Sequence, residues 1–249
     1  MTYCLAINTE NGLVFCSDSR TNAGVDQVST YSKMYRFGVE GERQFMVLSA
    51  GNLATTQAVV SRLKKDVKEE AEVSLLTVES MSDAAEYLGE VNRAQQEKHS
   101  DNNGSKGFEA SFIIGGQVRG DKPRVMMVYP AGNHITTSKD TRYLQIGESK
   151  YGKPILDRIL TAKTDLHTAA LCALVSMDST MRSNLTVGPP IELIIYEKDS
   201  FSIQHNRFDE DDEYLRELKK AWDARLVEAF VKLPPIVWQP QSLDESNEV

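Results

Sequence analysis

The sequence has few cysteines and few histidines. Its 249 residues contain three cysteines, Cys4, Cys16 and Cys172, without a CxxC spacing, and four histidines scattered at positions 99, 134, 167 and 205. This spacing indicates neither a disulfide framework nor a zinc site, and the scattered histidines do not suggest a Ser-His-Asp triad. We expect no metal and no cofactor. Reduced core thiols are the expected state, although a cross-strand pair of Cys4 and Cys16 is conceivable.

Long apolar runs and an excess of basic residues are also missing. No run of eighteen apolar residues occurs, and the amino terminus has neither the basic region nor the apolar stretch of a signal peptide. With 36 acidic and 28 basic residues, the formal net charge is −8. Nucleic acids and anionic membranes are negatively charged and bind surfaces with clustered Lys and Arg, which the negative net charge argues against. The sequence therefore predicts a cytoplasmic protein with no nucleic-acid partner and no membrane partner.

The length and the 41% hydrophobic content predict one large domain with a sizeable core. We expect this domain over residues 1–233. The remaining stretch, 234–249, contains prolines and acidic residues that disfavour a helix, so we expect a tail or a packed arm there.

Alternation of apolar residues and turn signals predicts strands that come in pairs, separated by pairs of helices. The expected strands are 2–8, 13–19, 33–37, 44–50, 110–116, one from residue 124, 134–138, a strand or turn at 143–149, 191–198 and 201–204. The expected helices are one opening after residue 52, then 80–98, 150–160, 166–177 and one from about 213 to 232, with a loop over 20–32. This order predicts an α+β fold rather than a Rossmann or barrel layout.

Four residues stand in a specific order along the amino-terminal part of the chain. Thr2 begins the first strand, Asp18 lies in SDSR, Lys33 begins the third strand, and Gly51 ends the fourth in SAGN. Together with MTYCLAI, SDSRTNAGVDQ, LSAGN and SMDSTMRSN, this arrangement resembles the β-subunits of the proteasome superfamily of amino-terminal nucleophile hydrolases. The resemblance covers nearly the whole chain. It implies a four-layer αββα sandwich of two stacked antiparallel sheets flanked by helices.

The resemblance implies a role for each of the four residues. Thr2, exposed as a new amino terminus by removal of Met1, is the expected nucleophile, with its own α-amine as the general base. Lys33 places a cation beside Thr2, and Asp18 pairs with Lys33. The backbone N–H of Gly51 faces the oxyanion. The plainer alternatives are a surface salt bridge between Asp18 and Lys33 and a turn glycine at the start of a helix.

Three further catalytic residues are expected by the same resemblance. Ser149 in IGES and Asp178 after the long helix are the candidates that orient the threonine amine, with Ser183 as the partner of Asp178 and Ser179 as its competitor. The Ser-Gly-Gly that usually follows in this family is absent, and STMRSNLTVGPP takes its place. Lys33 is also one residue nearer to Thr2 than in typical family members.

The implied substrate is a peptide or protein that lies extended between the loop at Thr21 and the strand end at Gly51. Tyr31, Tyr35, Ser49 and Leu53 are the expected pocket residues, with core packing as the alternative for the apolar and aromatic ones.

The expected function is that of a threonine-type endopeptidase in a homo-oligomeric ring or helical assembly. Because no GxxxxGK[ST] motif occurs, any ATP-dependent unfoldase would be a separate protein. The alternatives are a non-proteolytic amide hydrolase and a catalytically silent, self-assembling scaffold or peptide-binding complex.

Overall fold

The structure is a computed structural model that describes residues 1–22, 28–98 and 106–238. The chain divides into two units, Met1–Asp212 and Glu213–Val249, and each is described by itself. Within the first unit, two five-stranded antiparallel sheets carry almost all of the strand residues, and a separate two-stranded ribbon accompanies them.

The first sheet contains both ends of the unit. Its strand order is β10-β1-β2-β11-β12, and every neighbouring pair is antiparallel. The strands are β10 (Tyr143–Gly147), β1 (Tyr3–Thr9), β2 (Gly12–Ser17), β11 (Ile191–Glu197) and β12 (Gln204–Phe208). Because β1 is flanked on both sides, the start of the chain lies inside the sheet and not at its edge.

The second sheet is built from the middle of the chain, in the order β5-β6-β7-β8-β9. Its pairs are also antiparallel. The strands are β5 (Met34–Val39), β6 (Arg43–Gly51), β7 (Ala110–Val118), β8 (Arg124–Val128) and β9 (His134–Thr136). β6 and β7 pair along nine residues, from Arg43↔Val118 to Gly51↔Ala110, so the end of β6 is fixed by a long ladder.

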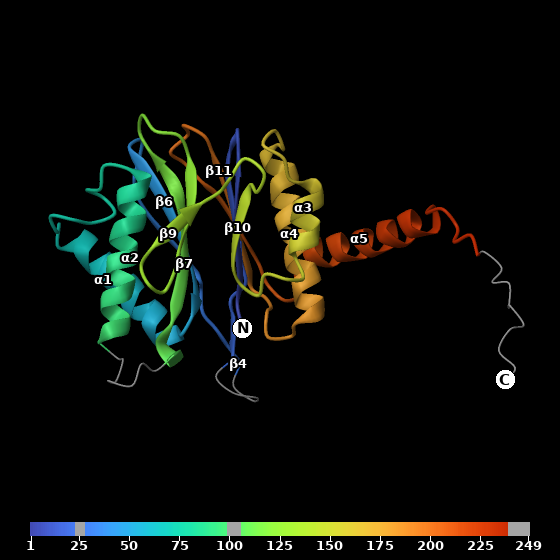
Figure 1. Cartoon of the computed structure of the whole chain (residues 1–249), viewed down its shortest axis with the longest axis horizontal. Helices are drawn as coiled ribbons and strands as arrows, with labels where there is room; N and C mark the ends of the chain where they lie inside the picture. Colours follow the sequence, from blue (N-terminus) through green and yellow to red (C-terminus); the bar gives the residue numbers. More distant parts are fainter. Residues whose placement is uncertain (23–27, 99–105, 239–249) are drawn as a thin grey trace, which may run out of the picture. The chain divides into compact units, whose positions relative to one another are not determined.

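Helices cover the outer face of each sheet, which gives the unit four layers (Figure 1). α1 (Leu53–Lys68) contacts β6, and α2 (Met81–Glu97) contacts β7, β8 and β9, while α4 (Leu166–Ser183) contacts β2, β1 and β11. α3 (Lys153–Ile159) packs on α4, and a short 3-10 helix, Lys106–Phe108, precedes β7. The expected αββα sandwich is confirmed.

Alternating side chains of each strand divide the core into layers. Along β6, Phe45 and Val47 belong to the cluster shared with α1 and α2, whereas Met46 and Leu48 belong to the cluster between the two sheets. Phe15 of β2 lies in this second cluster and is fully buried. The two sheets are therefore held face to face by a continuous apolar layer.

The three cysteines are free thiols and are buried. Cys4 pairs across the ladder with Ser17, and Leu5 pairs with Cys16. Successive residues of a strand point to opposite faces, so Cys4 and Cys16 point away from each other. A cross-strand disulfide between them is therefore ruled out by register.

The second unit contains α5 (Glu213–Val231), in which no residue is buried. The described tail residues Ile236, Val237 and Trp238 are also exposed. The expected domain end near residue 233 and the packed arm stay predictions.

Three expectations about element bounds were wrong. The stretch 20–32 is not a plain loop, because β3 (Arg20–Asn22) and β4 (Val28–Thr30) pair antiparallel within it. α4 continues to Ser183 instead of ending near residue 177. The closing strand β12 starts at Gln204 rather than ending there, because Asp199 and Phe201 adopt positive φ and lengthen the turn.

Candidate active site

The first residues of the chain are anchored beside the end of β10. Thr2 is partly buried and stands directly before β1, and its carbonyl oxygen accepts the N–H of Glu148 at 2.7 Å. Gly147 has φ +82°, and a methyl group on it would overlap the Thr2 carbonyl oxygen. Only glycine combines this conformation with such a close approach. Met1 itself is 62% exposed.

A buried ion pair lies next to this amino terminus. Lys33 Nζ donates to Asp18 Oδ1 at 2.7 Å, and the two side chains are 8% and 0% exposed. The same Asp18 oxygen accepts the N–H of Tyr3 at 3.0 Å, and its other oxygen accepts the N–H of Gly188 at 3.3 Å. Burial raises the pKa of Asp18, and the Lys33 ammonium and the two backbone donors offset that effect only in part.

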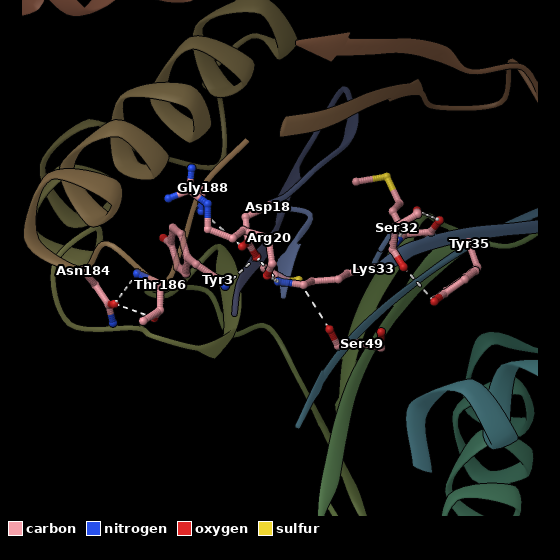
Figure 2. Close-up of polar contacts among 12 residues, drawn as sticks. Tyr3, Asp18, Arg20, Ser32, Lys33, Tyr35, Ser49, Asn184, Thr186 and Gly188 are labelled. Atoms are coloured by element: carbon pink, nitrogen blue, oxygen red, sulfur yellow. Dashed lines mark hydrogen bonds and ion pairs between the residues drawn. The ribbon is translucent and has the colours of Figure 1, made fainter. Parts of the chain in front are cut away.

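The chain between Asp18 and Lys33 supplies a second hydrogen-bond acceptor for the Lys33 ammonium. Lys33 Nζ also donates to the carbonyl oxygen of Arg20 at 2.7 Å. Arg20 opens the β3–β4 ribbon, whose register pairs it with Thr30. The N–H groups of Ser19 and Arg20 both donate to the carbonyl of Gly188. This ribbon therefore returns the chain to Lys33 while fixing the carbonyl that the ammonium binds (Figure 2).

Gly51 ends β6 with φ +118°, where a Cβ would overlap the carbonyl oxygen of Glu109. The next residue, Asn52, is the N-cap of α1 and accepts the N–H of Thr55 at 3.1 Å. The strand-to-helix turn thus requires glycine on conformational grounds and starts a helix at the same point. The turn-glycine reading of Gly51 is correct as a structural description.

A cavity of about 390 Å³ joins these features. Among the described residues that line it, Lys33 has the only charged side chain. The lining residues that the sequence predicted are Thr2, Thr21, Lys33, Tyr35, Ser49, Gly51 and Leu53. The lining residues that it missed are Met1, Ser32, Ala50, Thr56 and Gly147. Asp18 lies behind Lys33, so the structure brings eight of the twelve predicted residues together.

The other four predicted residues do not line this cavity. Tyr31 is exposed, and its N–H donates to the carbonyl of Ser19. Ser149 follows Glu148 and is partly buried. Asp178 lies inside α4 and not after it, which corrects the expected placement, and Ser183 is the exposed last residue of that helix.

The segment that replaces Ser-Gly-Gly contacts this region at two residues, Asp18 and Glu148. Gly188 binds Asp18, as described above. Asn184 Nδ2 donates to Glu148 Oε2 at 3.2 Å, and its Oδ1 accepts the N–H of Thr186 at 3.0 Å. Figure 2 shows Asn184, Thr186 and Gly188 on the same side of Asp18. Sequence reasoning missed Gly188, because its role depends on a contact with a residue 170 positions away.

The comparisons with known proteins agree with this architecture. A family model described as "Proteasome subunit" matches residues 2–195. This chain belongs to the proteasome subunit family. A search of curated protein sequences gives no match.

Several solved structures of Anbu proteins resemble this proteasome-family chain. Anbu (ancestral beta-subunit) from Yersinia bercovieri is 47% identical, with a TM-score of 0.91 over 95% of this chain and 100% of that one. The helical assembly of the Anbu complex from Pseudomonas aeruginosa is 44% identical, with a TM-score of 0.90 over 98% and 100%. An Anbu (Gly-1) mutant from Hyphomicrobium sp. strain MC1 is 45% identical, with a TM-score of 0.89 over 96% and 100%.

Metal-binding clusters and membrane-spanning helices are both absent from the described residues. No group of three or more His, Cys, Asp or Glu side chains in residues 1–22, 28–98 and 106–238 is arranged to hold a metal ion. None of the helices in the same part of the chain has the length and apolar character needed to cross a bilayer.

Proposed function

We propose that this chain is a threonine-type peptidase whose nucleophile is Thr2 after removal of Met1. The observation that carries the proposal is the cavity at the amino terminus, in which Thr2, Lys33 and Gly51 share one lining. Lys33 is also held by a buried carboxylate. A hydroxyl needs a base and a nearby cation to act as a nucleophile at neutral pH, and the α-amine of a processed Thr2 and Lys33 would supply them.

The reaction follows from the groups around the cavity. The Thr2 hydroxyl adds to the peptide carbonyl carbon while its proton passes to the α-amine, and the Gly51 N–H stabilises the oxyanion. When the tetrahedral intermediate collapses, the carbon–nitrogen bond breaks and the amine returns the proton to the leaving nitrogen. Water then hydrolyses the acyl-threonine ester with the same amine as base. Lys33 favours the unprotonated amine before the attack, which is the state that can accept the hydroxyl proton.

The roles of the peripheral residues are part of this proposal. Thr21, Tyr35, Ser49 and Leu53 line the cavity and would contact an extended substrate. Tyr31, which precedes the lining residue Ser32, stays a predicted substrate contact. Ser149, Asp178 and Ser183 stay predictions, because none of the three lines the cavity. We propose a cytoplasmic protein that acts in a homo-oligomer, which the helical assembly of the related Pseudomonas aeruginosa complex supports.

Met1 decides between this function and a silent scaffold or peptide-binding assembly. In the full chain Met1 lines the cavity, and its peptide bond to Thr2 removes the free amine. A chain that retains Met1 therefore has a hydroxyl without its base. The amide-hydrolase alternative uses the same residues on a small substrate and differs in the length of substrate accepted.

The test is intact mass and amino-terminal sequencing of protein purified from its native cells, before and after incubation with a peptide epoxyketone. A chain that lacks Met1 and gains one adduct on Thr2 is the expected result. Thr2→Ala should gain no adduct, whereas Thr141→Ala, an exposed threonine outside the cavity, should label normally. If trimming with methionine aminopeptidase exposes Thr2 and no adduct forms, the peptidase proposal is wrong. Cleavage of a two-residue peptide amide is then compared with that of a ten-residue one. This comparison distinguishes the peptidase from the amide hydrolase that acts on small substrates.

A further inference from the structure

A buried carboxylate of the first sheet reaches the residue that precedes Lys33. Glu192 lies on β11 and is 5% exposed. Its Oε2 accepts a hydrogen bond from the Ser32 hydroxyl at 2.9 Å, across 160 positions of sequence. Glu192 itself does not line the cavity, whereas Ser32 and Lys33 do. The contact therefore connects the sheet interior with the cavity wall.

Ser32 is held in place by several contacts at once. Its hydroxyl accepts the N–H of Met34 at 3.3 Å, and its carbonyl accepts the hydroxyl of Tyr35 at 2.8 Å. The hydroxyl has a single proton, for which Glu192 competes with the Met34 carbonyl at 3.0 Å. A carboxylate is the stronger acceptor. Figure 2 shows Ser32 and Tyr35 beside Lys33 at the start of the strand.

The Glu192 carboxylate is itself fixed from the edge of the sheet. Its Oε1 accepts Arg207 Nη1 at 3.1 Å. Arg207 stands directly opposite Glu192 in the β11–β12 ladder. On the other side, Ser17 stands opposite Glu192, yet its buried hydroxyl has no hydrogen-bond partner among the described residues. The two Glu192 carboxylate oxygens thus accept hydrogen bonds from Arg207 and Ser32, and not from the hydroxyl of Ser17 on the neighbouring strand.

We propose that Glu192 is a positioning residue, which holds Ser32 and through it aims the Lys33 ammonium at Thr2. The proposal rests on the function proposed above. Ser32 precedes Lys33 in the chain, and the Lys33 carbonyl accepts the N–H of Ser49 at 3.0 Å. The backbone of Lys33 is therefore fixed on its amino side by Ser32 and on its carboxyl side by Ser49. Loss of the Glu192 contact would free one side and let the ammonium move.

The alternative is that Glu192 and Arg207 only stabilise the edge of the sheet. Among the described residues, Asp18 after β2 pairs with Lys33 and Cys4 on β1 interacts with it, while Glu192 on β11 acts on Cys4 and on Tyr35 of β5. Removing the Glu192 charge without moving Lys33 would leave less negative charge near the Thr2 amine, so the acid limb of the rate profile would shift to lower pH. Displacing the Lys33 ammonium does the opposite, because the amine then holds its proton more tightly.

The experiment compares Ser32→Ala, Glu192→Gln and the double variant in the Met1-trimmed protein. We expect kcat to fall about tenfold in each single variant with KM within about twofold, which is less than the hundredfold that a 1 Å misplacement can cost. The acid limb should move to higher pH in both, and the double variant should be no slower than Glu192→Gln. Glu197→Gln, which removes an exposed carboxylate from the same strand, is the matched control and should leave both quantities unchanged.

The proposal would be overturned if the acid limb of Glu192→Gln stayed at the same pH or moved to lower pH. It would also be overturned if the losses in kcat of the two single variants added up in the double variant. A second readout does not depend on turnover: the NMR signal of the 15N-labelled Lys33 ammonium in a Thr2→Ala background. We expect this signal to move in Ser32→Ala and Glu192→Gln and to stay in Glu197→Gln. If it moves as expected and the Met1-trimmed wild type cleaves no peptide, the positioning role stands and the peptidase function fails. If it does not move while the wild type is active, the positioning role fails.

Discussion

Replacing Asp18 by alanine should be among the most damaging single changes in this chain. The carboxylate accepts three donors, Lys33 Nζ and the N–H groups of Tyr3 and Gly188. Asp18→Ala leaves the Lys33 ammonium, in an 8% exposed side chain, with the Arg20 carbonyl as its remaining described acceptor. Breaking a buried pair by removing one partner costs about 3–5 kcal/mol.

The backbone N–H groups of Tyr3 and Gly188 also lose their acceptor, and a buried unsatisfied N–H costs about 1–3 kcal/mol. Because these groups belong to the same network as Lys33, the separate costs do not simply sum. We therefore expect Asp18→Ala to lower the free energy of unfolding by about 4 kcal/mol. Removing Lys33 as well, in Asp18→Ala with Lys33→Met, should recover about 2 kcal/mol, because no uncompensated charge is then buried.

Urea unfolding followed by circular dichroism measures both variants, and it needs no catalytic activity. Glu69→Ala is the control, since the Lys65–Glu69 pair lies 3.8 Å apart with side chains more than 60% exposed. Exposed pairs of this kind contribute about 0–1 kcal/mol. An Asp18→Ala cost below about 1 kcal/mol, or a double variant less stable than Asp18→Ala, would refute the description of this pair as buried and mutually dependent.

Two more predictions follow from other contacts. Gly147→Ala should abolish epoxyketone labelling and destabilise by about 2 kcal/mol, because a methyl group overlaps the carbonyl of the proposed nucleophile. Gly120→Ala, with φ +92° but open space around it, should keep labelling, and equal losses of labelling would contradict the steric argument. At Asp66, burial raises the pKa, but hydrogen bonds from Tyr87 and Arg62 outweigh it, so the folded-state pKa lies below the usual value. This stabilisation is complete above the unfolded pKa of about 4 and is lost as pH falls through the folded one. Asp66→Asn should therefore be less stable than wild type at pH 7, with a difference that shrinks towards pH 2 in urea titrations. A difference that is constant with pH would be inconsistent with this linkage.

Sequence reasoning worked best where a signal is local. Glycine at the end of the SAGN strand and the Asn52 cap predicted the start of α1, and the turn residues TENG predicted the first hairpin. The stacking of two sheets followed from the family resemblance, because periodicity alone does not determine the number of layers. The strands β3 and β4 were missed, because each has only three residues and lies in a mostly polar stretch without apolar alternation.

The end of α4 shows a different limit. MDSTMRS contains neither glycine nor proline, and the first proline after it is Pro189. The helix therefore continues to Ser183, beyond the expected end at residue 177, and carries Asp178 within it. The Ser32–Glu192 contact could not be predicted either, since it joins residues that approach only when the two sheets stack.

The segment that departs from the proteasome pattern also supports the site. STMRSNLTVGPP lacks Ser-Gly-Gly, which by itself suggests a weakened active site. In the structure, however, Gly188 supplies an N–H to Asp18 and a carbonyl to Arg20, and Asn184 binds Glu148, whose N–H holds Thr2. This one segment therefore contacts Asp18, which binds the Lys33 ammonium, and also Glu148, which binds Thr2. Since the same two groups must be aligned for any Thr2 chemistry, the segment that departs from the family pattern takes part in holding both of them.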